Sequence, residues 1–408
     1  MDLDVEIARL LDFAARARVD AGFGHLDATG SVPPQAPVEL WITCRMTHVF
    51  GLASLLGPDR AGARALLDHG VAALLGPWRD ERSGGWFTTL RPDGAPDDDS
   101  KAGYAHAFVV LAGATATAAG HPRGPELLAE AVAVLRERFW EEEHGMVVDA
   151  WDRDFATCDA YRGLNANMHA VEALLAAYDV SGDSWALAAA TRIGERVAHD
   201  LGPGFSWRLP EHFDEAWVPQ PEHHRDRPAD PFQPYGVTIG HLLEWSRLLL
   251  HLHVASTRDR AHRVAADRQG LLGAAAALTG AAIRDGWAAD GTDGFVYTTD
   301  FDGAPVVRER MHWVIAEAVA NAAMRITVGL DDDAERDLER WLGFAEAHHV
   351  DLDGGSWWHE LDADLRPSGT VWPGKPDVYH QLQALWLARR ATTGERVVSF
   401  AGAAAAWA

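Results

Sequence analysis

The sequence predicts an all-α fold, an (α/α)6 barrel of inner and outer helix rings with short β-hairpins and long loops on one rim. The main observation is a histidine near the start of each of six helix-like segments, at intervals of roughly 58 to about 72 residues, as in repeat architectures. These are His48, His106, His169, His241, His312 and His380. A second observation is a glycine-led, hairpin-like segment that alternates with them. Each helix pair buries its apolar face only against its neighbours, which favours a closed ring.

Two kinds of helix are expected in each repeat. The histidine segments are apolar on nearly every face, as inner helices should be. They cover residues 41–53, 101–113, 165–177, 238–250, 310–322 and 376–388. The segments that follow several of them have apolar residues at three- and four-residue spacing and charges on the opposite face, which is typical of an outer, solvated helix. They cover residues 125–140, 184–201, 268–287 and 332–349.

The glycine-led segments contain β-favouring residues and a turn. They lie at residues 84–96, 145–157, 294–305 and 354–369, with a weaker version at 202–213. Short β-favouring runs around Pro-Asp-Gly or Asp-Gly turns predict small hairpins. We expect these hairpins to crowd one rim of the barrel and to cover a central pocket.

The domain organisation is expected to be simple. A length of 408 residues would suggest two or three domains. The repeat argues instead for a single catalytic domain over residues 1–408, and no Ser/Gly-rich or Pro-rich linker divides the chain. The longest irregular stretch, residues 203–233, contains apolar and aromatic residues and predicts an ordered functional loop.

Charge and composition exclude several classes of partner. A formal net charge of −24 leaves no basic stripe for nucleic acid and disfavours anionic membranes. The acidic N-terminus lacks the pattern of a signal peptide, and no apolar run reaches the length of a membrane span. Cys44 and Cys158 have no metal-like spacing and suggest a reducing cytoplasm. The sequence leaves the oligomeric state open, and a homo-oligomer is compatible with it.

Tryptophan is abundant, with 17 residues. Most are expected to fill the core. Several lie in predicted loops beside glycine and aspartate, where flat aromatic faces can stack on sugar rings. These are Trp86, Trp151, Trp207, Trp217, Trp357, Trp358 and Trp372.

The predicted inner histidines supply candidate proton-transfer groups, because imidazole titrates near neutrality. Glu244 follows His241 by one helical turn, so its carboxylate can hold the imidazole in one tautomer. The same spacing recurs in His169-x-x-Glu172 and, with an amide, after His380. A structural pair is the alternative for each of them.

The densest group of polar and aromatic residues is Trp372-Pro-Gly-Lys-Pro-Asp377-Val-Tyr-His380, at a loop-to-helix junction. Asp377 is also a good helix-start residue, so capping is the competing interpretation. On the first inner helix, Arg45 is a cation among apolar neighbours and needs a carboxylate or a ligand as its partner.

Further residues complete the predicted wall of the pocket: Tyr104, Asn165, and His312 and Trp313 together with Glu317. Six other histidines, His223, His224, His251, His253, His348 and His349, are expected on the surface or in loops. No zinc, calcium, phosphate or dinucleotide motif is present, so we expect no metal and no cofactor.

Segments in every repeat resemble the N-acylglucosamine 2-epimerase superfamily, and within it the branch of the mannose and sulfoquinovose isomerases. The most specific are TCRMTHVFGLA, GLNANMHAVEA, IGHLLEWSRLLL, HWVIAEA, and WWHELD followed by VWPGKPDVYHQLQA. The resemblance implies an (α/α)6 barrel and metal-free interconversion of sugars at carbons 1 and 2. It implies that His241 and His380 form the acid–base pair and that Glu244 orients His241. It also implies sugar-site positions, which are Arg45, His169 and Trp372, with Tyr104, Asn165, His312 and Trp313 as further matches.

The expected activity is therefore an aldose–ketose isomerase that interconverts D-mannose and D-fructose through a cis-enediol intermediate. A sulfoquinovose isomerase is a close alternative, with Arg45 or Lys375 as the sulfonate partner. A 2-epimerase of the N-acylglucosamine or cellobiose type is another. From different classes, an (α/α)6 glycoside hydrolase or lyase would need two carboxylates at the scissile bond, and a non-catalytic toroid would bind without turnover.

Overall fold

The structure is a computed structural model that describes residues 1–55, 62–258 and 268–393. The chain forms two compact units. Of the described residues, the N-terminal unit contains 8–190 and 374–379, and the C-terminal unit contains 1–7, 191–373 and 380–393. Within the described ranges, no helix is long and apolar enough to cross a membrane.

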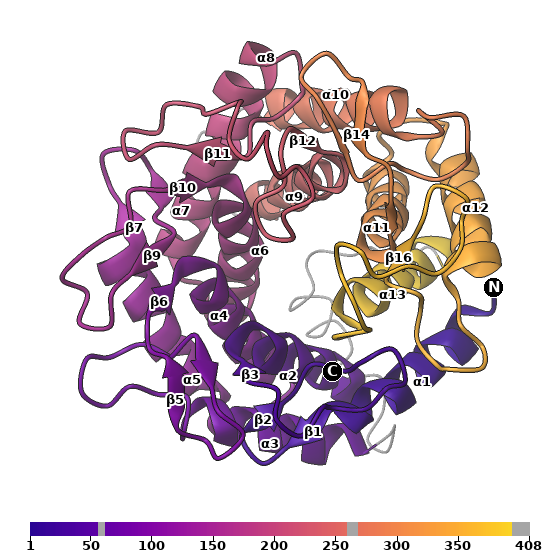
Figure 1. Ribbon diagram of the computed structural model, residues 1–408. Helices are drawn as coiled ribbons and strands as arrows, with labels where there is room; N and C mark the ends of the chain where they lie inside the picture. Colours follow the sequence, from indigo (N-terminus) through magenta and orange to yellow (C-terminus); the bar gives the residue numbers. More distant parts are fainter. Residues whose placement is uncertain (56–61, 259–267, 394–408) are drawn as a thin grey trace. The chain divides into compact units, whose positions relative to one another are not determined.

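Three inner helices organise the N-terminal unit: α2 (Leu40–Leu55), α4 (Gly103–Ala118) and α6 (Leu164–Ser181). In Figure 1 they run side by side, and α4 packs against both of the others. The outer helices α3 (Ala63–Leu74) and α5 (Gly124–Val134) pack on α2 and α4. Close packing of α4 on α5 depends on Gly113, where an added Cβ would lie 2.8 Å from the backbone nitrogen of Leu128.

The C-terminal unit repeats this pattern. Its inner helices are α9 (Ile239–Arg258), α11 (His312–Val328) and α13 (Tyr379–Thr393), which begins one residue inside the N-terminal unit. The outer helices α10 (Arg268–Gly286) and α12 (Ala334–Phe344) pack on α9 and α11 respectively (Figure 1). All six predicted inner helices are therefore present. Two further helices, α1 (Leu3–Ala14) and α7 (Ser184–Glu195), have residues in both units.

Several outer helices end differently from the prediction. Their last turn is a π-helical segment in place of continued α-helix, at η3 (Leu135–Phe139), η4 (Arg196–Leu201) and η5 (Ala345–His349). These follow α5, α7 and α12. Amphipathic periodicity does not distinguish a wide final turn from an α-helical one, so the sequence showed no sign of it. The remaining short helical pieces are a 3₁₀ turn, η1 (Ala15–Ala17), and α8 (Gly202–Gly204).

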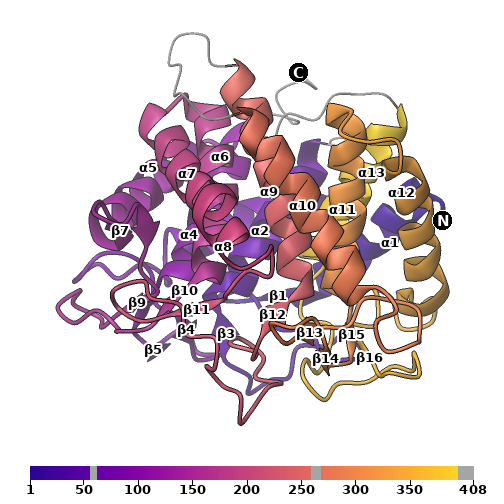
Figure 2. The same cartoon turned by 90° about the horizontal axis from the view of Figure 1, so that it is seen from above.

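The strands of the N-terminal unit are short. They are β1 (Arg18–Val19), β2 (Gly22–Phe23), β3 (Val38–Glu39), β4 (Thr89–Leu90), β5 (Pro96–Asp98), β6 (Lys101–Ala102), β7 (Trp140–Glu141), β8 (Met146–Val147), β9 (Ala150–Trp151) and β10 (Arg162–Gly163). Antiparallel pairs join β1 to β2, β4 to both β3 and β5, β6 to β9, and β7 to β8. In Figure 2, β3, β4, β5 and β9 lie beyond one end of the helices of this unit.

The strands of the C-terminal unit are β11 (His212–Phe213), β12 (Val237–Thr238), β13 (Thr298–Thr299), β14 (Pro305–Val307), β15 (Arg310–Met311) and β16 (Glu360–Leu361). Strand β13 pairs with β12 and β14, and β15 pairs with β16. Figure 2 shows β12 to β16 gathered at one end of α9, α10 and α11. Within this unit, the short strands and the loops between them therefore lie beside the first turns of the inner helices.

The predicted hairpins are partly confirmed. Residues 84–96 and 294–305 belong to true hairpins, β4–β5 and β13–β14. Residues 145–157 and 354–369 also contain strands with distant partners, because β9 joins β6 and β16 joins β15. Their local pairings are β8 with β7 and the bridge from Leu361 to Pro367. In the weaker segment, 202–213, the glycines begin a helical turn, α8. Strands β9 and β16 thereby attach their loops to β6 and β15, and these two strands lead directly into the inner helices α4 and α11.

Candidate active site

A line of buried charges connects three inner helices of the C-terminal unit. His380 Nδ1, on α13, donates to Glu317 Oε1 on α11 at 2.9 Å. The other oxygen of Glu317 accepts from Arg247 Nε on α9 at 2.8 Å, and Arg247 Nη2 lies 3.3 Å from Glu244 Oε1. Two carboxylates and one guanidinium leave an excess negative charge beside His380. That charge stabilises the imidazolium formed when His380 accepts a proton.

His241 has a different carboxylate partner from the one that the sequence predicted. Its Nδ1 lies 3.0 Å from Glu211 Oε2, and Glu211 is 4% exposed at its side chain. The carboxylate beside His241 is Glu211, whereas Glu244 pairs with Arg247, so the structure does not support the expectation that Glu244 orients His241. The physical reason is that a buried guanidinium demands a carboxylate more strongly than a neutral imidazole does. Sequence reasoning missed both Glu211 and Arg247, although Arg247 is a cation in an otherwise apolar inner helix.

Trp313 contacts both histidines. Its ring centroid lies 5.2 Å from that of His241 and 5.7 Å from that of His380. His312, its neighbour at the start of α11, stacks on His359 with ring centroids 3.5 Å apart, and His359 supplies the carbonyl that accepts from the His312 backbone N–H. The two imidazoles, each with a carboxylate at Nδ1, therefore lie against the same indole.

Arg45 dominates the polar contacts of the inner helices in the N-terminal unit. Its guanidinium donates to Tyr104 Oη at 2.9 Å and to Asp377 Oδ2 at 3.3 Å. Burial alone would lower the pKa of Arg45, but the charges of Tyr104 and Asp377 raise it above its ordinary value. Among the described residues, its buried Nε has no hydrogen-bond partner. Asp377 also accepts from the backbone N–H of Tyr379, so it both caps α13 and holds Arg45.

His169 and Glu172 form the pair that their spacing predicted, with His169 Nδ1 3.6 Å from Glu172 Oε2. The same carboxylate accepts from Tyr379 Oη. The His169 ring lies edge-to-face against Tyr104 at 5.2 Å between centroids. Asn165 is half-buried in the first turn of α6. Arg45, Tyr104 and His169 are thus connected by direct or shared contacts within one unit.

Two of the six repeat histidines have structural roles. His106 Nδ1 donates to the carbonyl of Ala102 at 2.8 Å, and its Nε2 accepts from the backbone N–H of Trp86 at 3.1 Å. Both nitrogens are used by the backbone, and burial lowers the pKa of His106 to about 3. His48 donates to Thr115 Oγ1 at 2.6 Å, and burial lowers its pKa to about 4. Neither matches the prediction of an inward-facing proton-transfer group.

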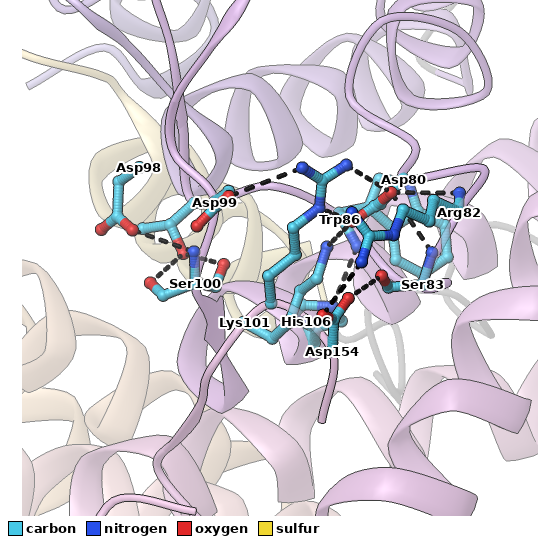
Figure 3. A network of polar contacts seen from close by, with 12 residues as sticks. Asp80, Arg82, Ser83, Trp86, Asp98, Asp99, Ser100, Lys101, His106 and Asp154 are labelled. Carbon is cyan, nitrogen blue, oxygen red and sulfur yellow. Dashed lines mark hydrogen bonds and ion pairs between the residues drawn. The ribbon is translucent and has the colours of Figure 1, made fainter. Parts of the chain in front are cut away.

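Figure 3 shows the network that holds His106 in place. Asp80 accepts from Lys101 Nζ at 3.0 Å and from Arg153 Nε at 2.9 Å, and the Lys101 side chain is fully buried. Lys101 belongs to β6, directly before α4, whereas Asp80 belongs to the turn that leads to Trp86. Their ion pair therefore fixes the turn against the first residues of α4.

Several aromatic and histidine predictions need correction. Trp86 and Trp357 are fully buried and donate from their indole nitrogens to Leu74 and Glu6, and Trp217 is 3% exposed, so these three are core residues. Trp372 is half-buried and lies edge-on to Phe232. His251 and His349, which were expected on the surface or in loops, are also buried.

One group of side chains in the C-terminal unit has the composition of a cation site. Ligand atoms of Glu244, Glu317 and His380 lie within 4.8 Å of one another. The guanidinium of Arg247 already bonds to both carboxylates. A divalent ion there would bring two further positive charges next to Arg247, so the donor set does not suit a metal.

Comparison with known proteins gives consistent matches. Residues 22–384 match the N-acylglucosamine 2-epimerase family. A D-mannose isomerase of Thermobifida fusca is 48% identical over 94% of this chain and 92% of its own. One of Pseudomonas cannabina pv. alisalensis is 43% identical over 94% of this chain and 91% of its own. A crystal structure of a D-mannose isomerase superposes with a TM-score of 0.86 at 25% identity, over 95% of this chain and 97% of the other. These likenesses confirm the predicted (α/α)6 fold class.

Proposed function

Because the chain belongs to the N-acylglucosamine 2-epimerase family, we propose that it interconverts D-mannose and D-fructose. The family and its relatives confirm the prediction of a sugar isomerase. The structural observation that supports the reaction is the pair of imidazoles, His241 and His380, with a carboxylate at each Nδ1 and Trp313 against both. At His380 the hydrogen bond from Nδ1 to Glu317 places the basic lone pair on Nε2, and the carboxylate beside each histidine stabilises its imidazolium.

His380 is the proposed base. After the sugar ring opens, the proton on carbon 2 is acidic because the carbonyl at carbon 1 is exposed. A base must then approach it to about 3 Å. His380 takes this proton and returns it to carbon 1 on the same face, which gives a cis-enediol intermediate. Glu317 holds the imidazole, and Arg247 supplies the positive charge that pairs with Glu317.

His241 is the proposed partner acid and base. It helps to open the ring and moves the hydroxyl proton from oxygen 2 to oxygen 1. Glu211 orients it and stabilises its charged form. Glu244 is paired with Arg247 and lies close to Glu317 and His380, so in this scheme it adds negative charge near His380.

The sugar-binding residues remain proposals. Arg45 supplies a cation for the negative charge that develops on the enediolate, and its buried Nε suits an oxygen ligand. We assign Tyr104, Asn165, His169, His312, Trp313 and Trp372 to substrate binding on the basis of the family motifs. The family match runs through residues of both units, which supports a single catalytic domain over residues 1–408.

The reaction is proposed to need no metal or other cofactor. The support is the donor set itself: the guanidinium of Arg247 already bonds to both carboxylates nearest to His380, which disfavours a further cation. The substrate is then a free monosaccharide, and neither nucleic acid nor a membrane is a partner. The two free cysteines, Cys44 and Cys158, favour a cytoplasmic location.

The test is incubation with D-mannose in deuterated buffer containing a chelator, followed by NMR. Fructose with deuterium at carbon 1 supports the metal-free enediol route, and partial transfer of the original hydrogen supports a single shielded base. Glucose labelled at carbon 2 without fructose would show an epimerase with the histidines on opposite faces. Absence of exchange would contradict mannose as the substrate and make sulfoquinovose the next sugar to assay.

A further inference from the structure

Glu360, the glutamate of the WWHELD motif, has no part in the proton transfers above. Its side chain is fully buried on β16. One carboxylate oxygen accepts from the backbone N–H and the hydroxyl of Thr370, both at 2.7 Å. The other accepts from the backbone N–H groups of Val371 and Trp372, both at 2.8 Å. One carboxylate thus binds three consecutive residues of the loop that carries Trp372.

These donors favour the ionised carboxylate. Burial alone would raise the pKa of Glu360, but the backbone N–H of Trp372 and the donors of Thr370 lower it below its ordinary value. Hydrogen bonds from backbone N–H groups to a carboxylate are short and strong, and they fix direction as well as distance. The loop at Thr370 to Trp372 is therefore held by a charge.

The backbone of the same strand holds the start of α11. Glu360 pairs with Met311 in the β15–β16 ladder. The preceding residue, His359, accepts from the His312 backbone N–H at 2.9 Å and stacks on its ring. The strand thereby joins two parts of the candidate site. Its backbone sets the first turn of α11, with His312 and Trp313, and its carboxylate sets the loop with Trp372.

The indole of Trp372 also packs against an aromatic ring. The ring of Phe232 lies edge-on to it at 5.0 Å, and Phe232 is 49% exposed. An exposed neighbour restrains an indole weakly, and the bond from the Trp372 backbone to Glu360 adds a buried restraint. A side chain that is fixed before the sugar arrives loses less conformational entropy on binding.

We propose that Glu360 is a positioning residue that holds Trp372 in place for the sugar. This inference rests on the proposed function and adds to it a residue that touches no substrate. A residue that acts only through Trp372 must lose its influence on sugar binding when the indole is absent. That requirement distinguishes it from a residue that only stabilises the fold.

The experiment is a double-mutant cycle of Glu360→Gln and Trp372→Ala, with KM and kcat for D-mannose as readouts. In the wild-type background, Glu360→Gln should raise KM about tenfold, because hydrogen bonds to a charged group are lost. In the Trp372→Ala background it should change KM less than about twofold. Thr370→Val removes only one donor and should give a smaller rise in KM. Glu339→Gln, at an exposed glutamate of α12, is the matched control and should leave both constants unchanged.

A second readout needs no turnover. Amide hydrogen exchange at Thr370, Val371 and Trp372 should be faster in Glu360→Gln and Thr370→Val than in wild type and in Glu339→Gln. Unchanged exchange in both variants would overturn the proposal, even if the wild type proves inactive on mannose. Faster exchange with an equal KM effect in both backgrounds would also overturn it. If mannose is not a substrate but exchange responds as expected, the proposed function fails while the anchoring of the loop stands.

Discussion

The Nδ1 atom of His241 lies 3.0 Å from a carboxylate oxygen of Glu211. Glu211 lies directly before β11 and does not belong to α9, the helix of His241. The partner of a proposed acid–base histidine therefore comes from a loop segment. The other histidine, His380, takes its carboxylate from an inner helix, α11. The two imidazoles are supported by different parts of the C-terminal unit, so their roles can be separated by mutation.

Replacing Glu211 by Gln should lower kcat for mannose about 10- to 100-fold, with a smaller effect on KM. The amide can still contact His241, but it cannot stabilise the imidazolium. Steady-state kinetics at neutral pH measure this change. The matched control is Glu215→Gln, because Glu215 is an exposed glutamate of the same segment. Equal activity of the two variants would contradict a role for Glu211 in catalysis.

Replacing Arg247 by Met should destabilise the protein by about 3–5 kcal/mol, since it leaves Glu244 and Glu317 buried without their cation. Urea unfolding at neutral pH measures the loss. The double variant Glu244→Gln/Arg247→Met should recover part of it, because one uncompensated charge is removed. A loss of stability below about 1 kcal/mol would mean that the negative charges of Glu244 and Glu317 are compensated without Arg247.

The sequence was sufficient for the helices because periodicity is a local signal. Each inner helix repeats an apolar pattern on all faces, and each outer helix has an amphipathic one. The pairing of the short strands could not be predicted in the same way. Strand β16 pairs with the distant β15 in addition to its local bridge from Leu361 to Pro367, and two-residue strands carry no register signal.

The candidate site was predictable only in part, for a related reason. The spacing of His169 and Glu172 fixes a contact because both lie on one helix. The spacing of His241 and Glu244 is the same, but Arg247 lies one further turn along α9 and takes Glu244. Glu211 could not be found, because residues 203–233 have no periodicity. Equivalent positions of the repeat also have different neighbours. Both ring nitrogens of His106 bond to the backbone, so this histidine has a structural role.

Replacing His380 by Asn should abolish exchange of the carbon-2 proton with solvent and lower kcat about 10³-fold. The asparagine amide can replace Nδ1–H in the bond to Glu317, so the substitution mainly removes Nε2. NMR of mannose in deuterated buffer measures the exchange. The corresponding Glu317→Gln variant should retain slow exchange, because it leaves the imidazole in place. Persistent exchange in His380→Asn would assign the base to another residue.

The buried histidines make stability depend on pH, and His106 tests the direction. Its ordinary pKa of 6.5 is lowered to about 3 by burial. Between these values the unfolded chain binds a proton that the folded protein does not, so stability falls as pH is lowered from 6.5 toward 3.

His106→Gln should be less stable at pH 7, because it disturbs the bonds to Ala102 and Trp86, but its stability should fall less steeply between pH 6 and 4.5. The slope should decrease by about 1 kcal/mol per pH unit, measured by urea unfolding across that range. His199→Gln, at an exposed histidine, should keep the wild-type slope. An unchanged slope in His106→Gln would show that His106 does not contribute to the pH dependence.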